Sequence, residues 1–332
     1  MRKAFILVTL LTYGRSSSVA SDLKCCDFSS AEIEKLNKGE ALARLFKTTD
    51  RDLAIVGAVK LRRTKEEFLQ WFRHVENFKF SPMVAEVAAF QNPPKPIDLS
   101  RLTLDEQELK DIRACMPGKC NSKLSAMEIN RLKNEVDWKS AEAPQKASSL
   151  FREMMHDYVA NYLRRGNAVL GRLNDKESAS DIADTYRSMI QNFPYLREAF
   201  PTVFQQLRDF PGAAPSDSNH FVYWSREKYG FGMKPLLNII HVSVHKPIPN
   251  TVLIISKQIR STHYFDGSLG VTMLVDAPGG AYLVYVNRSR IDLLRDAGWF
   301  KRTLVERAVP GATRKEMIGI RARLEQSMSN NK

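Results

Sequence analysis

The chain has 332 residues, of which 43% are hydrophobic and 26% are charged. This balance is typical of an ordinary globular protein, and it excludes a disordered chain or a multi-span membrane protein. The formal charge is +13, and the basic residues are scattered along the chain rather than gathered in one tract.

The N-terminus has the pattern of a cleavable secretory signal peptide. Arg2 and Lys3 supply a positive start, and residues 4–13 carry no charge. Ser18 and Ala20 then place small side chains where signal peptidase reads them, which predicts cleavage near Ala20. The uncharged run is shorter than the roughly 20 residues that cross a bilayer. We therefore expect a periplasmic or secreted protein.

Export and basic charge together narrow the choice of partners. We expect no nucleic-acid partner, because such partners are not met outside the cytoplasm. Short basic clusters at residues 60–63 and 164–165 favour peripheral contact with an anionic membrane. A merely solvated basic surface is the alternative interpretation.

Four cysteines follow the signal segment, and two of them form an informative pair. An even number in an oxidising compartment indicates disulfides. The proline and glycine between Cys115 and Cys120 favour a tight turn that would bring the two Cα atoms within bonding range. The pairing of Cys25 and Cys26 stays open. No haem or zinc spacing is present, so we expect no metal and no cofactor.

The first segment after the signal, residues 27–90, predicts a β-β-α unit. Apolar and β-branched residues at 41–46 and 53–61 indicate two strands. Thr64 and Glu67 then form a capping-box sequence ahead of an apolar repeat at helical spacing.

The second segment, residues 91–215, predicts helices almost throughout. Apolar residues recur at helical spacing over residues 150–163, with Gly166 as the C-terminal cap. The same spacing returns over residues 182–190 and 195–207. Methionine and aromatic side chains in such a pattern indicate core packing rather than cofactor contacts.

The third segment, residues 219–328, predicts an antiparallel sheet followed by a final helix. No helix-length stretch interrupts the strands, which argues against parallel βαβ units. The last helix is expected over residues 313–328. The expected strands span residues 220–224, 236–245, 251–257, 258–264, 269–275 and 281–287.

Three stretches of the outer segments carry a family resemblance. Residues 55–84 contain a strand followed by a helix, and residues 312–328 contain a last helix. Between them, residues 256–294 contain strands with Arg260 and Gly270 in the expected places. This pattern resembles the START-like superfamily of lipid-transfer and polyketide-cyclase-like domains. It is also similar to exported bacterial proteins of unassigned function.

The resemblance implies an α+β helix-grip fold, in which an antiparallel sheet wraps around a long C-terminal helix and encloses a cavity. Residues 27–90 and 219–328 would form this domain, with residues 91–215 as a helical insertion. We therefore expect an exported binding protein whose partner is a lipid or another hydrophobic or amphipathic small molecule.

Five residues are the candidate ligand contacts in such a cavity. Arg288 and Arg290 follow an apolar strand and share one of its faces by alternation. At a cavity mouth, their planar side chains would bind an anionic head group bidentately. Arg260 is the arginine of the family pattern. Tyr223 and Trp224 would line the cavity, with core packing as the alternative.

Catalysis on the same scaffold is the main alternative function. His263 and Asp266 would form an acid–base pair if a turn brought them together, and His241 is a further candidate. His241 and His245 lie on one face of a strand but about 13 Å apart, too far to share a metal. No nucleophile-elbow, zinc-protease or phosphate-loop motif is present, so an enzyme is the less favoured hypothesis. A third hypothesis is an envelope adaptor that uses the helices of residues 91–215.

Overall fold

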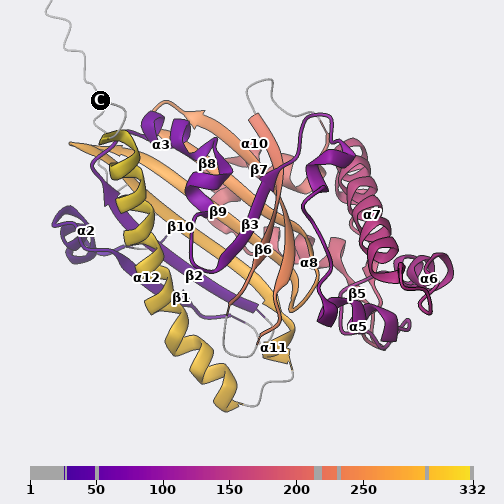
Figure 1. Cartoon of the computed structure of the whole chain (residues 1–332). Helices are drawn as coiled ribbons and strands as arrows, with labels where there is room; N and C mark the ends of the chain where they lie inside the picture. The colour runs from indigo at the N-terminus through magenta and orange to yellow at the C-terminus, as the bar shows by residue number, and fades with distance from the viewer. Residues whose placement is uncertain are drawn as a thin grey trace, which may run out of the picture.

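The computed structural model describes residues 26, 28–48, 52–212, 219–229, 233–295 and 299–329 (Figure 1). The predicted signal peptide, Cys25 and most of the linker before residue 219 lie outside these residues. Within them, no helix combines the length and the apolar character needed to cross a bilayer.

The centre of the fold is an eight-stranded antiparallel sheet within the described residues, in the order β1-β2-β10-β9-β8-β7-β6-β3. The first sequence segment supplies the strands at both edges and the third supplies those between them, because β2 pairs with β10 and β3 pairs with β6. Two stretches that are far apart in the chain therefore form one sheet. Its strands are β1 (Leu42–Phe46), β2 (Asp52–Leu61), β3 (Val84–Ala89), β6 (Asn219–Glu227), β7 (Leu236–Ile248), β8 (Thr251–Ser261), β9 (Phe265–Ala277) and β10 (Gly280–Ile291).

One face of the sheet packs against three helices, and we call it the helix-grip face. These helices are α3 (Lys65–Phe72), α4 (Val75–Lys79) and the long C-terminal α12 (Trp299–Ser329), with α3 and α12 in front of the sheet in Figure 1. Gly57 of β2 allows the close approach of α12, because a Cβ there would lie 2.8 Å from Cγ2 of Thr313. The predicted α+β fold, a sheet wrapped on a long C-terminal helix, is confirmed.

The opposite face, which we call the insertion face, is covered by the second sequence segment. Its side chains join those of the covering helices in one large core that includes Trp224, Leu253, Phe151 and Met155. The covering elements are η2 (Pro96–Leu99), α5 (Glu106–Ala114), α6 (Ala126–Glu135), α7 (Ala143–Arg165), η3 (Gly166–Val169), the hairpin β4 (Arg172–Leu173) and β5 (Ser180–Asp181), α8 (Ile182–Gln191), α9 (Pro194–Ala199) and α10 (Pro201–Asp209). Two short helices, α2 (Ser30–Asn37) and α11 (Asp292–Arg295), complete the fold.

Local signals in the sequence account for several element ends. Thr64 and Glu67 form the expected capping box at the start of α3. Gly166, with a φ of 60°, ends α7. Cys115 and Cys120 form the predicted disulfide just after α5. Cys26 is fully buried.

Three boundaries differ from expectation. Two strands were expected over residues 251–257 and 258–264, but residues 251–261 form one strand, in which an extra residue opposite Ile239–Ile240 makes a bulge without ending the pairing. Residues 195–207 form two helices, because Pro201 disfavours a helical conformation at Phe200. The last helix begins before Pro310 rather than after it, although proline removes one hydrogen bond from the ladder.

Candidate ligand-binding pocket

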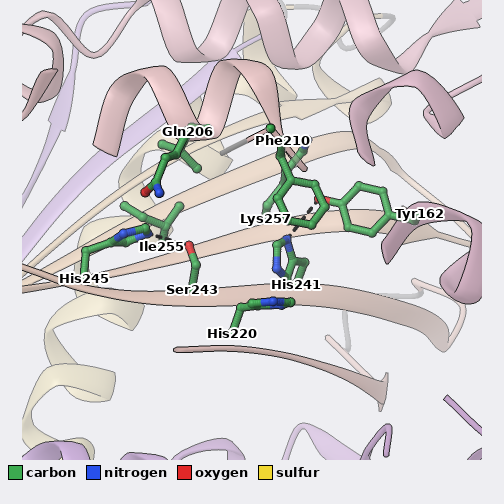
Figure 2. A pocket seen from close by; sticks show the side chains of 11 residues that line it. Tyr162, Gln206, Phe210, His220, His241, Ser243, His245, Ile255 and Lys257 are labelled. Carbon is green, nitrogen blue, oxygen red and sulfur yellow. Dashed lines mark hydrogen bonds between the residues drawn. The ribbon is translucent and has the colours of Figure 1, made fainter. Parts of the chain in front are cut away.

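A pocket with a volume of about 40 Å³ lies between the insertion face of the sheet and the helices α7 and α10. Figure 2 shows side chains of β6, β7 and β8 on one side of it, facing others from α7 and from α10 and its C-terminal end. The polar lining comprises Tyr162, Gln206, His220, His241, Ser243, His245 and Lys257, and the apolar lining includes Leu207, Phe210 and Ile255.

The period-2 geometry of β7 and β8 explains the polar floor. His241, Ser243 and His245 alternate with valines that face the helix-grip side. On β8, Lys257 stands directly opposite His241 in the strand register. Cross-strand partners of this kind have Cβ atoms about 5 Å apart, so the two side chains share one place on the floor.

Lys257 is the least expected residue of the pocket. It is only 2% exposed, yet among the described residues no carboxylate forms an ion pair with it. Its Nζ donates a hydrogen bond to Oδ1 of Asn167 and lies 4.5 Å from the ring centre of Tyr186. Burial lowers the pKa of Lys257 to about 7. Near neutral pH, both the ammonium and the amine are therefore populated.

The local structure of η3 holds Asn167 in place. Nδ2 of Asn167 donates to the backbone oxygens of Leu207 and Arg208, at 3.0 and 2.9 Å. With both amide protons engaged, its Oδ1 is left to accept from Lys257. The preceding Gly166 is required here, because a Cβ would lie 1.9 Å from the backbone oxygen of Phe210.

His241 has one ring nitrogen with a hydrogen-bond partner and one without a partner among the described residues. Its Nδ1 lies 3.0 Å from Oη of Tyr162, whose pKa is held well above its usual value by burial. Burial, with smaller contributions from His220 and Lys257, lowers the pKa of His241 well below its usual value. The ring is therefore neutral, and Tyr162 donates to Nδ1. The other nitrogen, Nε2, then carries a proton and has no partner among the described residues.

Two further polar groups lie beside this pair. His245 contacts Oγ of Ser243 at 2.9 Å, and burial lowers its pKa to about 4, so it is neutral at pH 7. Both side-chain amide atoms of Gln206 are buried without a hydrogen-bond partner in the described protein. Buried polar groups without partners cost about 1–3 kcal/mol each. A ligand that satisfies them would recover that cost.

The helix-grip face carries a cluster of aromatic side chains in place of the polar groups that line the pocket. Phe72 stacks on Phe78 with ring centres 4.1 Å apart, and Phe78 meets Tyr223 edge-on at 5.7 Å. A cation on this face, Lys79, is paired with Glu227 at 2.7 Å. Aromatic side chains thus pack against one another on the face where the resemblance implies a cavity.

The structure places the five predicted ligand contacts outside the pocket lining. Tyr223 packs on the helix-grip face, whereas Trp224 is buried on the insertion face, where its Nε1 donates to the backbone of Asp98 at 2.9 Å. Arg260 is buried in an ion pair with Glu128 at 2.6 Å.

The two arginines of β10 do share one face, as their alternation predicts. Both reach toward α8: Arg288 contacts the backbone oxygen of Asn192 at 3.4 Å, and Arg290 contacts Oγ of Ser188 at 3.5 Å. Arg290 also pairs with Asp52 at 2.9 Å. They therefore lie at the insertion rather than beside α12.

The predicted acid–base candidates have separate partners. Nδ1 of His263 contacts the backbone oxygen of Asn121 at 2.8 Å. Asp266 contacts Lys123 at 2.6 Å, and the same lysine also pairs with Asp175 and Asp292. Of the three candidates, His241 alone lines the pocket.

Sequence reasoning missed Lys257, Tyr162 and Gln206. A signal for Lys257 was present, since a single lysine interrupts the apolar run of β8. Tyr162 and Gln206 gave no such signal, because each belongs to an ordinary amphipathic helix.

No protein-family model, curated protein or solved structure matches the chain significantly. Membership of the START-like superfamily stays a prediction.

Proposed function

We propose that this protein binds a small amphipathic molecule whose anionic group lies against Lys257. The observation that carries this proposal is a buried lysine in a pocket with no carboxylate partner among the described residues. A buried cation is unfavourable unless it is paired, and a ligand anion would supply the missing charge.

The rest of the lining suits the remainder of such a ligand. Leu207, Phe210 and Ile255 offer an apolar wall, and burial of ligand area against it contributes about 25 cal/mol per Å² before the costs of binding. Nε2 of His241 and the amide of Gln206 are available to orient the polar end.

The volume limits the ligand's size. A site of about 40 Å³ holds roughly three water-sized groups, enough for the acidic end of a ligand, and the exposed His220 marks the side on which its chain would leave the site. We therefore propose a short-chain carboxylic acid, or the acidic end of a longer lipid, as the ligand class. The packing of the helix-grip face leads us to place it on the insertion face. We further propose that binding takes place outside the cytoplasm, as the N-terminal pattern predicts.

Calorimetry with butanoate and its neutral analogue butanamide at pH 6.5 tests this proposal. Butanoate should bind at least about tenfold more tightly, because only the anion pairs with Lys257. Lys257→Met should abolish this preference, whereas Lys110→Met, which removes an exposed lysine of α5, should not change it. Equal binding of the two compounds, or a preference that survives in Lys257→Met, would contradict the proposal.

A further inference from the structure

We infer that the Lys257 amine forms a reversible imine with a small aldehyde bound in this pocket. The inference rests on the proposed function in one respect: the pocket must admit a short apolar chain with a polar end. It adds a covalent step that anion binding does not require.

Other lysines with low exposure show why Lys257 stands apart. Lys123 is surrounded by Asp175, Asp266 and Asp292, and burial is outweighed there, so its pKa is raised. Lys79 is paired with Glu227 and likewise has a raised pKa. These lysines stay charged, and an ammonium has no electron pair to attack a carbonyl carbon.

Within the described part of the chain, the groups that face Lys257 carry no negative charge. They are His241 on β7, Asn167 in η3, and the rings of Tyr162 on α7 and Tyr186 on α8. Both phenols have raised pKa values through burial and keep their protons. This setting leaves much of the Lys257 amine unprotonated near pH 7, as in desolvated lysines that form Schiff bases.

Formation of the imine needs only the Lys257 amine, the aldehyde and a hydrogen-bond donor. The nitrogen electron pair of Lys257 forms a bond to the aldehyde carbon while the carbonyl oxygen accepts a hydrogen bond from Nε2 of His241. The carbinolamine then loses its oxygen as water, with both hydrogens supplied by the former amine. The product is the imine, and hydrolysis reverses the reaction without any oxidant or reductant.

Reductive trapping tests the inference in the unmodified full chain. The protein is incubated with butanal and sodium cyanoborohydride at pH 7, and peptide mass spectrometry locates the butyl groups. Lys257 should be labelled at least about tenfold faster than the exposed Lys110 and than the ion-paired Lys123. In denaturant, the three rates should become equal. Slower or equal labelling of Lys257 in the folded chain would overturn the inference.

Butanoate separates this result from the proposed function. If butanoate binds and the imine does not form, anion binding stands and the covalent step is wrong. If Lys257 is trapped although butanoate neither binds nor slows labelling, the imine stands and the anion proposal is wrong. If butanoate neither binds nor slows labelling and no imine forms, both are wrong.

Discussion

The two faces of the sheet each bring a lysine against buried tyrosines, and they treat it in opposite ways. On the helix-grip face, Lys79 lies 5.9 Å from the ring centre of Tyr223 and is paired with Glu227. On the insertion face, Lys257 lies 4.5 Å from the ring centre of Tyr186 and has no carboxylate partner in the described part of the chain. Both lysines lie beside tyrosine rings, but Lys79 is more exposed than Lys257 and it alone of the two has an acidic partner among the described residues.

That difference separates a structural ion pair from a candidate functional group. Burial raises the pKa of Glu227, but the charge and hydrogen bond of Lys79 outweigh it and lower this pKa to about 2. Lys257 has no such compensation, and its pKa falls to about 7. A strongly perturbed group in a pocket is a candidate for function, whereas the Lys79–Glu227 pair keeps two opposite charges compatible with burial.

The largest expected effect comes from removing the paired lysine. Lys79→Met should lower the free energy of unfolding by about 4 kcal/mol, because it leaves the buried carboxylate of Glu227 without its cation. Urea unfolding at pH 7 measures this change. Removing both partners in Lys79→Met/Glu227→Met should restore most of the stability. The exposed Lys35→Met serves as control and should change stability by less than about 0.5 kcal/mol. A change below about 1 kcal/mol in Lys79→Met would contradict a structural role for the pair.

Lys257→Met should raise the free energy of unfolding at pH 7, whereas Lys79→Met lowers it. The folded pKa of Lys257 is about 7 and lies below its unfolded value, so between these two values the unfolded chain binds more protons. The stability of the unsubstituted protein should therefore rise with pH across that window, by up to about 1.4 kcal/mol per pH unit relative to Lys257→Met. At pH 7, the variant should be the more stable protein. Parallel pH dependences from pH 7 to 9.5 would show that Lys257 is charged and paired in solution.

The third prediction concerns the ligand. The affinity for butanoate should fall about tenfold per pH unit above pH 7, because the anion prefers the ammonium form of Lys257. Calorimetry from pH 6 to 9 measures this dependence. Unchanged affinity across this range would mean that another group holds the anion.

The smallest expected effect tests whether the two faces unfold together. Thr64 caps α3 on the helix-grip face, and Asp105 caps α5 in the insertion. Replacing either with alanine should cost about 1 kcal/mol. If the sheet makes one cooperative unit of both sides, each variant should shift a single unfolding transition. Two transitions, each sensitive to one variant, would show that the insertion unfolds separately.

Part of the fold could be predicted because its signals are local. The capping box at Thr64, the glycine end of α7 and the Cys115–Cys120 disulfide each depend on residues close together in the chain. Errors arose where tertiary contacts outweighed such signals. The edge strand β3 was not predicted, since its apolar residues are short and its pairing with β6 spans more than 130 positions.

The candidate site was predicted least well, for the same reason. Alternation correctly placed His241 and His245 on one side of β7. It could not show that this side faces α7 and α10, nor that Tyr162 reaches His241 from 79 positions away. The predicted arginine contacts instead became ion pairs or backbone contacts, because acidic groups and carbonyls from distant segments lie beside them.

The periodicities of the sequence by themselves determined an antiparallel sheet, a helical second segment and a last amphipathic helix, because side-chain repeats of two and about 3.6 residues follow from backbone geometry alone. The tertiary structure decided which face the second segment covers and which charges meet a partner. A lysine in an apolar strand has the same local sequence whether or not a carboxylate arrives from elsewhere in the chain. Its pKa, and with it the chemistry proposed for Lys257, depends on that arrival.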